Sequence, residues 1–196
     1  MSDKKFVVVS MANENFRQLQ DLTSKTLRSY AEKHGYSFLT KIISNDSERP
    51  PSWHKIEFIQ EVFTGGYEYV WWVDCDAIIV NSEIRIEDFI KEGKDFYISR
   101  DMNGINCGVF MIRNNERSVS FFEKVWSMVE YKDHIWWEQA AIMELLSSGW
   151  YSEEFVEYLP SSVFNNYEYT KSCLVHHMAG KPLEERYAFF SSVIEF

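Results

Sequence analysis

Two carboxylates interrupt an otherwise apolar run near the middle of the chain. Asp74 and Asp76 follow the apolar residues 69–73 and precede the apolar residues 77–80. In an extended chain, side chains two residues apart project to the same side, so the two carboxylates are expected to meet. Each charge is costly to bury unpaired, and a shared divalent cation removes that cost. Mg²⁺ and Mn²⁺ prefer oxygen ligands, including phosphate oxygens, so the pair predicts a metal site for a nucleotide substrate. The alternative is a solvated strand end or a turn cap.

A second group of polar residues lies near the other end of the chain. An apolar stretch runs into His177, and Gly180 and Lys181 follow within one turn. Imidazole binds metals, glycine lets the backbone approach a phosphate closely, and an ammonium group supplies countercharge. A lone histidine is more often structural, so this group gains weight only together with the carboxylate pair.

The overall charge limits the possible partners. The 196 residues carry a net charge of −10, which repels nucleic acid and anionic membranes, and no basic stripe is visible. We therefore expect no nucleic-acid partner, and we expect a metal ion or a focused basic pocket if the ligand is a polyanion. The aromatic content of 17% hints at a surface that stacks on flat ligands or sugar rings.

Strands and helices alternate along the chain, which predicts a layered α/β fold. Strands are expected at residues 6–10, 36–43, 69–73, 96–99, 108–112 and 174–177. Helices are expected from a cap at Asn13 or Asn15 to Gly35, and over residues 56–63, 116–131 and 137–146. Right-handed crossovers make the first half a mostly parallel sheet, with its functional edge at the carboxyl ends of the strands.

The cysteines and the apolar runs indicate the compartment. Cys75, Cys107 and Cys173 are odd in number and lie in apolar runs, which favours buried free thiols over disulfides or a zinc site. No run approaches the roughly 20 residues of a membrane span, and residues 6–9 are too short for a signal-peptide core. We therefore expect a cytoplasmic protein without a membrane span, either complete or one module of a longer polypeptide.

Five motifs occur in the order and spacing of one enzyme family. They are Trp53-His-Lys55, Val70-Trp-Trp-Val-Asp-Cys-Asp-Ala77, Gly104-Ile-Asn-Cys-Gly-Val-Phe-Met-Ile-Arg-Asn114, Trp137-Glu-Gln139 and His177-Met-Ala-Gly180. Over roughly residues 5–185 the chain resembles the GT-A-fold glycosyltransferases. The most similar family comprises galactomannan galactosyltransferases, yeast mannosyltransferase subunits and plant xyloglucan xylosyltransferases.

The resemblance implies one GT-A domain over residues 1–196, a Rossmann-like mixed sheet flanked by helices. Its nucleotide-binding half would cover about residues 1–80, and about 81–196 would complete the acceptor and metal sites.

The resemblance also implies a metal site and a donor site. Asp74 would lie near the ribose or the metal, Asp76 would bind the metal, and His177 would be the third protein ligand. The donor site would include Lys55 at the nucleotide or its phosphates, Asn106 and Gly108 at the sugar, and Gly180 with Lys181 at the diphosphate. The cofactor would be Mn²⁺ or Mg²⁺.

The implied reaction moves a sugar from a nucleotide-diphosphate sugar, with UDP favoured, to a glycan hydroxyl. Glu138 and Gln139 match the family's pair close to the anomeric carbon. Retention through Gln139 is favoured, whereas an inverting enzyme would use Glu138 as its base. The family usually has Asp where Glu138 stands. From its length we also expect this chain to lack most of the membrane anchor and stem of its relatives.

Acceptor contacts are expected from four residues near these motifs. Sugar faces pack on aromatic rings, which suggests Trp136 and Trp137, and sugar hydroxyls bond carboxylates and amides, which suggests Asp101 and Asn103. Trp136 and Trp137 could equally hold a helix in the core.

Two other functions remain possible from the sequence. Aspartate-nucleophile phosphohydrolases also place Asp-x-Asp after a buried strand, but normally on the first strand and with a later acidic pair. A catalytically silent module that binds a sugar nucleotide or glycan would keep the fold without turnover.

Overall fold

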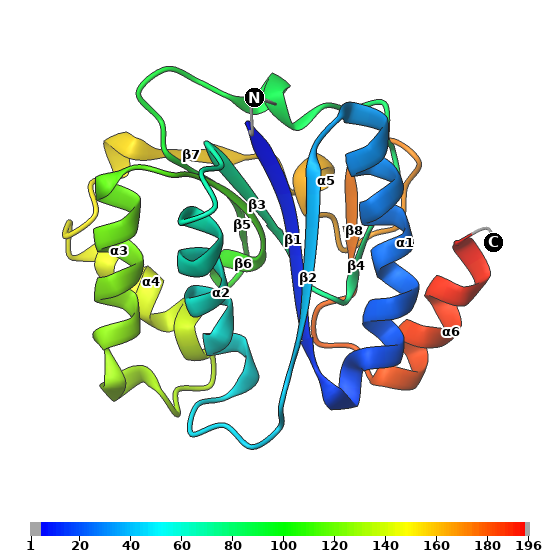
Figure 1. Cartoon of the computed structure of the whole chain (residues 1–196), viewed down its shortest axis with the longest axis horizontal. Helices are drawn as coiled ribbons and strands as arrows, with labels where there is room; N and C mark the ends of the chain where they lie inside the picture. Colours follow the sequence, from blue (N-terminus) through cyan, green and yellow to red (C-terminus); the bar gives the residue numbers. More distant parts are fainter. Residues whose placement is uncertain (1–4, 195–196) are drawn as a thin grey trace.

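The computed structural model describes residues 5–194 and is built around a six-stranded sheet (Figure 1). In spatial order its strands are β2 (Ser37–Ile43), β1 (Phe6–Asn13), β3 (Tyr69–Val73), β6 (Gly104–Arg113), β5 (Phe96–Asp101) and β7 (Val156–Leu159). Strands β2, β1 and β3 are parallel, β6 runs antiparallel to β3 and β5, and β7 is parallel to β5. The expected mixed α/β architecture, with a parallel first half, is confirmed.

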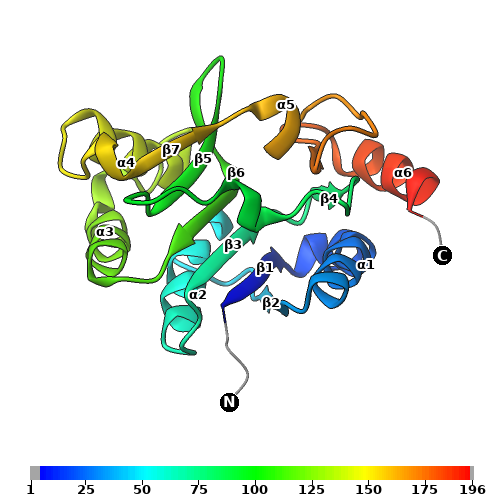
Figure 2. The ribbon, with the colours of Figure 1, turned by 90° about the horizontal axis from the view of Figure 1, so that it is seen from above.

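Helices cover both faces of this sheet (Figure 2). One face packs against α2 (His54–Phe63), α3 (Glu116–Ser127) and α4 (Trp137–Ser147). The other face carries α1 (Arg17–His34) and the short α5 (Ser161–Phe164). Strands β1 and β3 are apolar almost throughout because both of their faces are buried. Within residues 5–194, no helix combines the length and the apolar character that crossing a membrane would require.

A small second sheet completes the fold. Strand β4 (Ala77–Ile79) pairs antiparallel with β8 (Val175–His177), and Ala77 lies opposite His177. The last helix, α6 (Leu183–Val193), packs beside α1 at the carboxyl end of the chain (Figure 1). Its buried Phe190, together with Ile194 directly after the helix, shares an apolar cluster with residues of α1 and β4.

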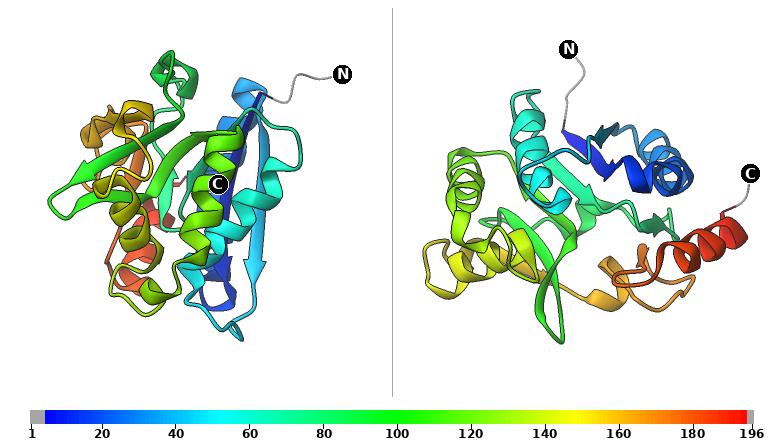
Figure 3. Two further views of the ribbon diagram at one scale, coloured as in Figure 1. Left: turned by 90° about the vertical axis from the view of Figure 1, so that its left-hand side faces the viewer. Right: turned by 90° about the horizontal axis from the view of Figure 1, so that it is seen from below.

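Several element boundaries differ from the sequence prediction. The predicted helix 116–131 ends at Ser127, and a 3₁₀ turn over Val129–Tyr131 follows. Strand β6 begins at Gly104 rather than Gly108, because its first residues pair with β5 in a hairpin that extends from the body of the fold (Figure 3). Helix α1 begins at Arg17 after a 3₁₀ turn, without the asparagine side-chain cap that was expected. Gly35 does end α1, with a φ of 73° that suits glycine.

Candidate active site

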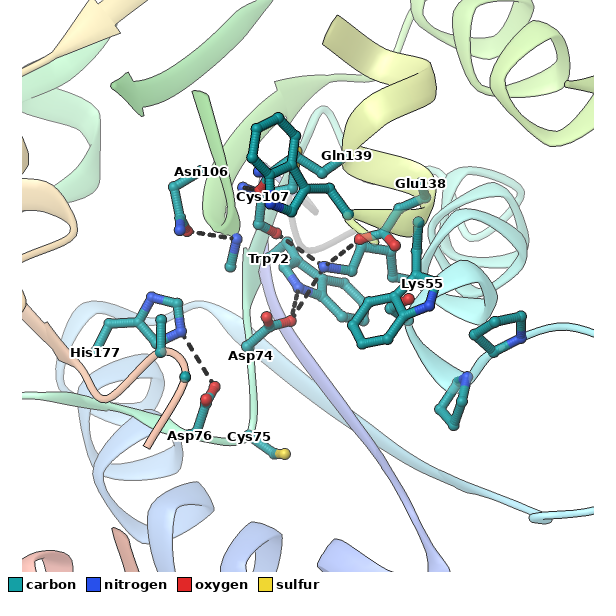
Figure 4. Close-up of a pocket in the computed structure, with 18 of the residues that line it drawn as sticks. Lys55, Trp72, Asp74, Cys75, Asp76, Asn106, Cys107, Glu138, Gln139 and His177 are labelled. Carbon is teal, nitrogen blue, oxygen red and sulfur yellow. Dashed lines mark hydrogen bonds and ion pairs between the residues drawn. The ribbon is translucent and has the colours of Figure 1, made fainter. Parts of the chain in front are cut away.

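Asp74 and Asp76 lie in the turn that connects β3 to β4. The Ala77 amide donates to the Asp74 carbonyl at 3.1 Å, and the Asp74 amide donates to the Gly108 carbonyl at 2.7 Å. The expectation of an extended Asp-x-Asp segment is therefore wrong, because the chain turns here to leave the central sheet for the small one. The two carboxylates nevertheless point to a common region, which is shown in Figure 4.

The pairing of β4 with β8 brings His177 to these carboxylates. The Met178 amide donates to the Asp76 carbonyl at 3.0 Å, which fixes the two strands side by side. His177 Nε2 lies 3.2 Å from Asp76 Oδ1, and one ligand atom from each of Asp74, Asp76 and His177 lies within 4.8 Å of the others. Two carboxylates and an imidazole whose ligand atoms lie this close together fit the donor set of a small divalent cation.

The charges around this group keep Asp76 ionised. Burial raises the pKa of Asp74, and the positive charge of Lys55 offsets only part of that effect. Burial acts on Asp76 in the same direction, but His177 and Arg186 outweigh it and hold its pKa at about 2. Burial lowers the pKa of His177, yet the Asp76 carboxylate raises it above its ordinary value. Asp76 therefore carries the negative charge that a metal ligand needs.

The orientation of the His177 ring is set by Asn165. Asn165 Nδ2 donates to Asn106 Oδ1 at 2.9 Å, so Asn165 Oδ1 accepts from His177 Nδ1, also at 2.9 Å. This arrangement places the proton on Nδ1 and leaves Nε2 as the nitrogen available to a metal. Asn165 is 2% exposed and was not singled out from the sequence.

Gly108 is required by the proximity of His177. A β-carbon built at residue 108 would lie 2.2 Å from His177 Cε1 and 2.9 Å from Nε2. The carbonyl of Gly108 also accepts from the Asp74 amide, so the strand cannot easily move away. The glycine predicted for the donor-sugar pocket thus has a direct packing role against the third member of the candidate metal site.

Gly108→Ala is expected to displace the imidazole and to weaken Mn²⁺ binding about 10- to 100-fold, as disturbance of a metal ligand's support usually does. Overpacking should also lower the free energy of unfolding by about 1–3 kcal/mol. Calorimetric titration with Mn²⁺ and thermal unfolding measure the two effects. The double variant Gly108→Ala/His177→Ala should be more stable than Gly108→Ala alone, and equal stability would show that the ring contact is not the cause.

Lys55 forms a buried charge cluster with Asp74 and Glu138 (Figure 4). Its Nζ lies 3.3 Å from Asp74 Oδ1 and 3.0 Å from Glu138 Oε1, and it donates to the Cys107 carbonyl at 2.9 Å. Burial lowers the pKa of Lys55, but the two carboxylates outweigh burial and raise it. Lys55 thus holds the first residue of the Asp-x-Asp turn, whose Oδ1 also accepts from Trp72 Nε1 at 2.7 Å.

Glu138 and Gln139 enter the site from the first turn of α4. Glu138 is 3% exposed, with Oε1 paired to Lys55, whereas Gln139 Oε1 accepts from the Cys107 amide at 3.0 Å. Trp137, directly before them, has a φ of 45° and is the one non-glycine residue with positive φ among residues 5–194. A backbone conformation of this kind costs about 1–3 kcal/mol and is typically retained at functional sites.

One cleft of about 870 Å³ joins these features. Its lining includes every residue predicted for the site except Lys181, namely Lys55, Asp74, Asp76, Asp101, Asn103, Asn106, Gly108, Trp136, Trp137, Glu138, Gln139, His177 and Gly180. Lys181 instead has Nζ 3.3 Å from Glu185 Oε1, and both side chains are about half exposed. The roles of these residues remain predictions, but their proximity is now established.

The rim of the cleft is formed by the β5–β6 hairpin and the segment before α4. Trp136 and Trp137 are 37% and 45% exposed, so neither is a core residue. Met102, between Asp101 and Asn103 at the hairpin tip, is 97% exposed. The hairpin is tied to the chain after α5 by Tyr167, whose hydroxyl donates to Asp101 Oδ2 at 2.5 Å.

The sequence did not single out Asn165, Tyr167 or Arg186, which contact the predicted site residues His177, Asp101 and Asp76 respectively. Asn165 and Tyr167 lie in a segment without regular periodicity, and Arg186 lies in a helix whose neighbouring acidic residues suggest a solvated surface. Only the polar character of residues 165–167, in the segment between α5 and the His177 strand, could have signalled them. Arg186 had no such signal.

Comparisons with known proteins place the chain in a family. A model of the galactosyl transferase GMA12/MNN10 family matches residues 3–94 and 90–181. An uncharacterised alpha-1,2-galactosyltransferase of Schizosaccharomyces pombe is 30% identical over 63% of this chain and 44% of its own length. The probable alpha-1,6-mannosyltransferase MNN10 of Saccharomyces cerevisiae is 23% identical over 81% of this chain and 50% of its own. The chain thus spans about half the length of the curated relatives it matches.

Solved structures agree on the fold. A glycosyltransferase involved in glycosylation of the major capsid of PBCV-1 has a TM-score of 0.83 at 18% identity, covering 96% of this chain and all of that one. The galactosyltransferase LgtC, solved with donor and acceptor sugar analogues, has a TM-score of 0.60 at 13% identity, covering 97% of each chain. These likenesses confirm the GT-A fold expected from the motifs. With the family model matched from residue 3 to residue 181, the chain belongs to the galactosyl transferase GMA12/MNN10 family.

Proposed function

We propose that this protein is a metal-dependent glycosyltransferase that moves a hexose or related sugar from a nucleotide-diphosphate sugar to a glycan hydroxyl. The observation that carries the proposal is the convergence of Asp74, Asp76 and His177, within 4.8 Å of one another, in the same cleft as Gln139. The names of the relatives, which are galactosyl- and mannosyltransferases, support the reaction class. A UDP-sugar donor is favoured.

Asp74, Asp76 and His177 would hold Mn²⁺ or Mg²⁺ in this proposal. The bound cation would supply positive charge for the diphosphate that leaves as the bond to the anomeric carbon breaks, a contribution of several kcal/mol. Asn165 keeps Nε2 of His177 directed at Asp76, and Lys55 keeps Asp74 in place. The protein thus positions its ligands before the donor arrives.

Retention of anomeric configuration is the favoured outcome. Glu138 is nearly fully buried and its Oε1 is paired with Lys55. Its Oε2 has no hydrogen-bond partner but is buried as well, so the carboxylate is not exposed to an acceptor in the cleft. Gln139 uses its carbonyl oxygen on the Cys107 amide, which leaves its amide nitrogen as a donor near the sugar. The acceptor hydroxyl would bond to the anomeric carbon from the face that the diphosphate leaves and would pass its proton to the departing phosphate oxygen.

The acceptor is proposed to lie along the rim of the cleft. Trp136 and Trp137 present partly exposed rings, which suit the apolar faces of sugars, and Asp101 and Asn103 present polar groups from the opposite hairpin. The net charge of −10 favours a neutral glycan over an anionic one.

A panel of nucleotide sugars tests the proposal. Thermal unfolding with UDP- and GDP-sugars and Mn²⁺ should show stabilisation by at least one donor, by about 2.7 kcal/mol at 100 times its Kd. EDTA should abolish the shift, and release of the nucleoside diphosphate should follow when a suitable glycan is added. Stabilisation without release under any condition would instead favour a silent binding module. No response to any nucleoside diphosphate with metal would contradict the proposal.

A further inference from the structure

A nucleoside diphosphate needs more positive charge than one cation bound by Asp74, Asp76 and His177 would provide. Its phosphates would enter a cleft that already holds the carboxylates of Asp74 and Asp76. Among the described residues that line this cleft, the basic side chains are Lys55, His177 and Arg186. Which of them can bind phosphate depends on which donor groups are already engaged.

Lys55 and His177 have their donors committed elsewhere. An ammonium group has three N–H bonds, and Lys55 Nζ already contacts three acceptors, which are Asp74, Glu138 and the Cys107 carbonyl. His177 donates from Nδ1 to Asn165, and its Nε2, directed at Asp76, is the nitrogen available to the metal rather than a donor for phosphate. Neither residue can bind a phosphate without breaking a buried contact.

Lys181, the residue expected at the diphosphate from the sequence, does not line the cleft. Its side chain is 54% exposed, and its Nζ pairs with Glu185. The glycine before it, Gly180, does line the cleft, so the chain passes close to the site while the ammonium group is directed to the surface.

Arg186 meets the requirements that the other cations do not. Its Nη2 lies 3.1 Å from Asp76 Oδ2, its Nε donates to the Met178 carbonyl at 3.1 Å, and its side chain is 13% exposed. A guanidinium group has five N–H bonds, so these two contacts leave further donors, and its planar fork matches phosphate oxygens. Arg186 therefore lies beside the candidate metal ligand with donors still available.

Helix α6 holds Arg186 in this position. Phe190, one turn later on the same face, is fully buried in a cluster with Leu19 and Leu22 of α1 and Ile78 of β4. The guanidinium group is therefore carried by a packed helix rather than a loop. The family-model match ends at residue 181, before α6 begins at Leu183.

We infer that Arg186 binds the diphosphate of the nucleotide-sugar donor at the Asp76 side of the metal site, and that α6 is part of the donor site. This inference rests on the proposed function and adds a residue to it. Arg186 would neutralise the leaving diphosphate in the role that the sequence suggested for Lys181.

Binding measurements on the full chain test this inference. The probes are inorganic diphosphate, UDP and GDP, each with saturating Mn²⁺, and Mn²⁺ alone. Loss of a charge-assisted hydrogen bond in Arg186→Gln should weaken diphosphate binding about 10- to 100-fold. Binding of Mn²⁺ alone should be unchanged or tighter, because a cation beside Asp76 has been removed. The matched control Lys181→Gln should stay within about twofold of wild type for every probe, as expected of an exposed ion pair.

The outcomes separate this inference from the proposed function. Wild-type diphosphate affinity in Arg186→Gln would overturn the inference about Arg186 but not the proposed function. A parallel loss of Mn²⁺ binding and diphosphate binding would also overturn it, because it would indicate a purely structural role. Failure of the wild-type protein to bind any of the three diphosphates would overturn both. If Arg186→Gln does not fold, Arg186→Lys decides, because it keeps the charge but not the fork. Weaker diphosphate binding by that variant supports the inference, and wild-type affinity overturns it.

Discussion

Asp76→Asn is expected to lower sugar transfer about 10³-fold. Asparagine keeps the size and one oxygen of the side chain but lacks the charge that would hold a divalent cation together with Asp74 and His177. If the cation contributes about 4 kcal/mol of transition-state stabilisation, its loss corresponds to a factor of this size in rate. Initial rates with a donor and glycan from the panel give the size of the effect, and titration with Mn²⁺ gives its cause.

Asp88→Asn is the matched control for this variant. This substitution makes the same chemical change at an exposed side chain, in the 3₁₀ turn Ile86–Phe89, which does not line the cleft. Transfer and Mn²⁺ affinity should therefore stay at wild-type values. Because Asp76 also contacts His177 and Arg186, thermal unfolding of Asp76→Asn should be followed in parallel. Transfer at the wild-type rate by folded Asp76→Asn would exclude a metal role for this residue.

The sequence predicts the central sheet except for its edge strand β7, because burial leaves a compositional signal. Strands β1 and β3 are covered on both faces and must be apolar throughout, a pattern that is visible without knowing their neighbours. Strands β4 and β8 have three residues each, too few for any periodicity, so β4 was not expected. Their pairing places His177 against Asp76, and the resemblance to a known family rather than local pattern predicted that these residues belong together.

The sequence was a poorer guide to which charged side chains enter the candidate site, because that depends on which of them the fold buries. Nothing in the sequence distinguishes the environments of the cations Lys55, Lys181 and Arg186. In the structure the side chain of Lys55 is fully buried, that of Lys181 is half exposed, and that of Arg186 is nearly buried. Which cation enters the cleft depends on how α6 packs against α1. The helix sequence, in which Glu184 and Glu185 are followed by Tyr187 and two phenylalanines, does not reveal that face. The sequence therefore predicts which chemistry is present better than it predicts which side chain performs it.

Lys55→Met should produce the largest loss of stability among the single substitutions considered. The thioether fills part of the space but leaves Asp74 and Glu138 without their shared cation, and Lys55 and Glu138 are each 3% exposed. Removing one partner from a buried ion pair costs about 3–5 kcal/mol, because the remaining charge keeps its desolvation penalty. For a chain of this length that corresponds to a fall in Tm of roughly 6–20 °C, measurable by calorimetry.

Lys41→Met provides the comparison at the surface. Lys41 pairs with Glu61, and the two side chains are 42% and 62% exposed, so its loss should cost no more than about 1 kcal/mol. Adding Glu138→Gln to Lys55→Met removes one of the two unpaired charges, and the double variant should therefore recover part of the lost stability. An equally unstable double variant would mean that Lys55 contributes through its contact with Trp72, whose ring centre lies 5.3 Å from Lys55 Nζ, rather than through its ion pairs. Recovery would show that the unpaired charge of Glu138 accounts for part of the loss, as the ion pairs of Lys55 with Asp74 and Glu138 predict.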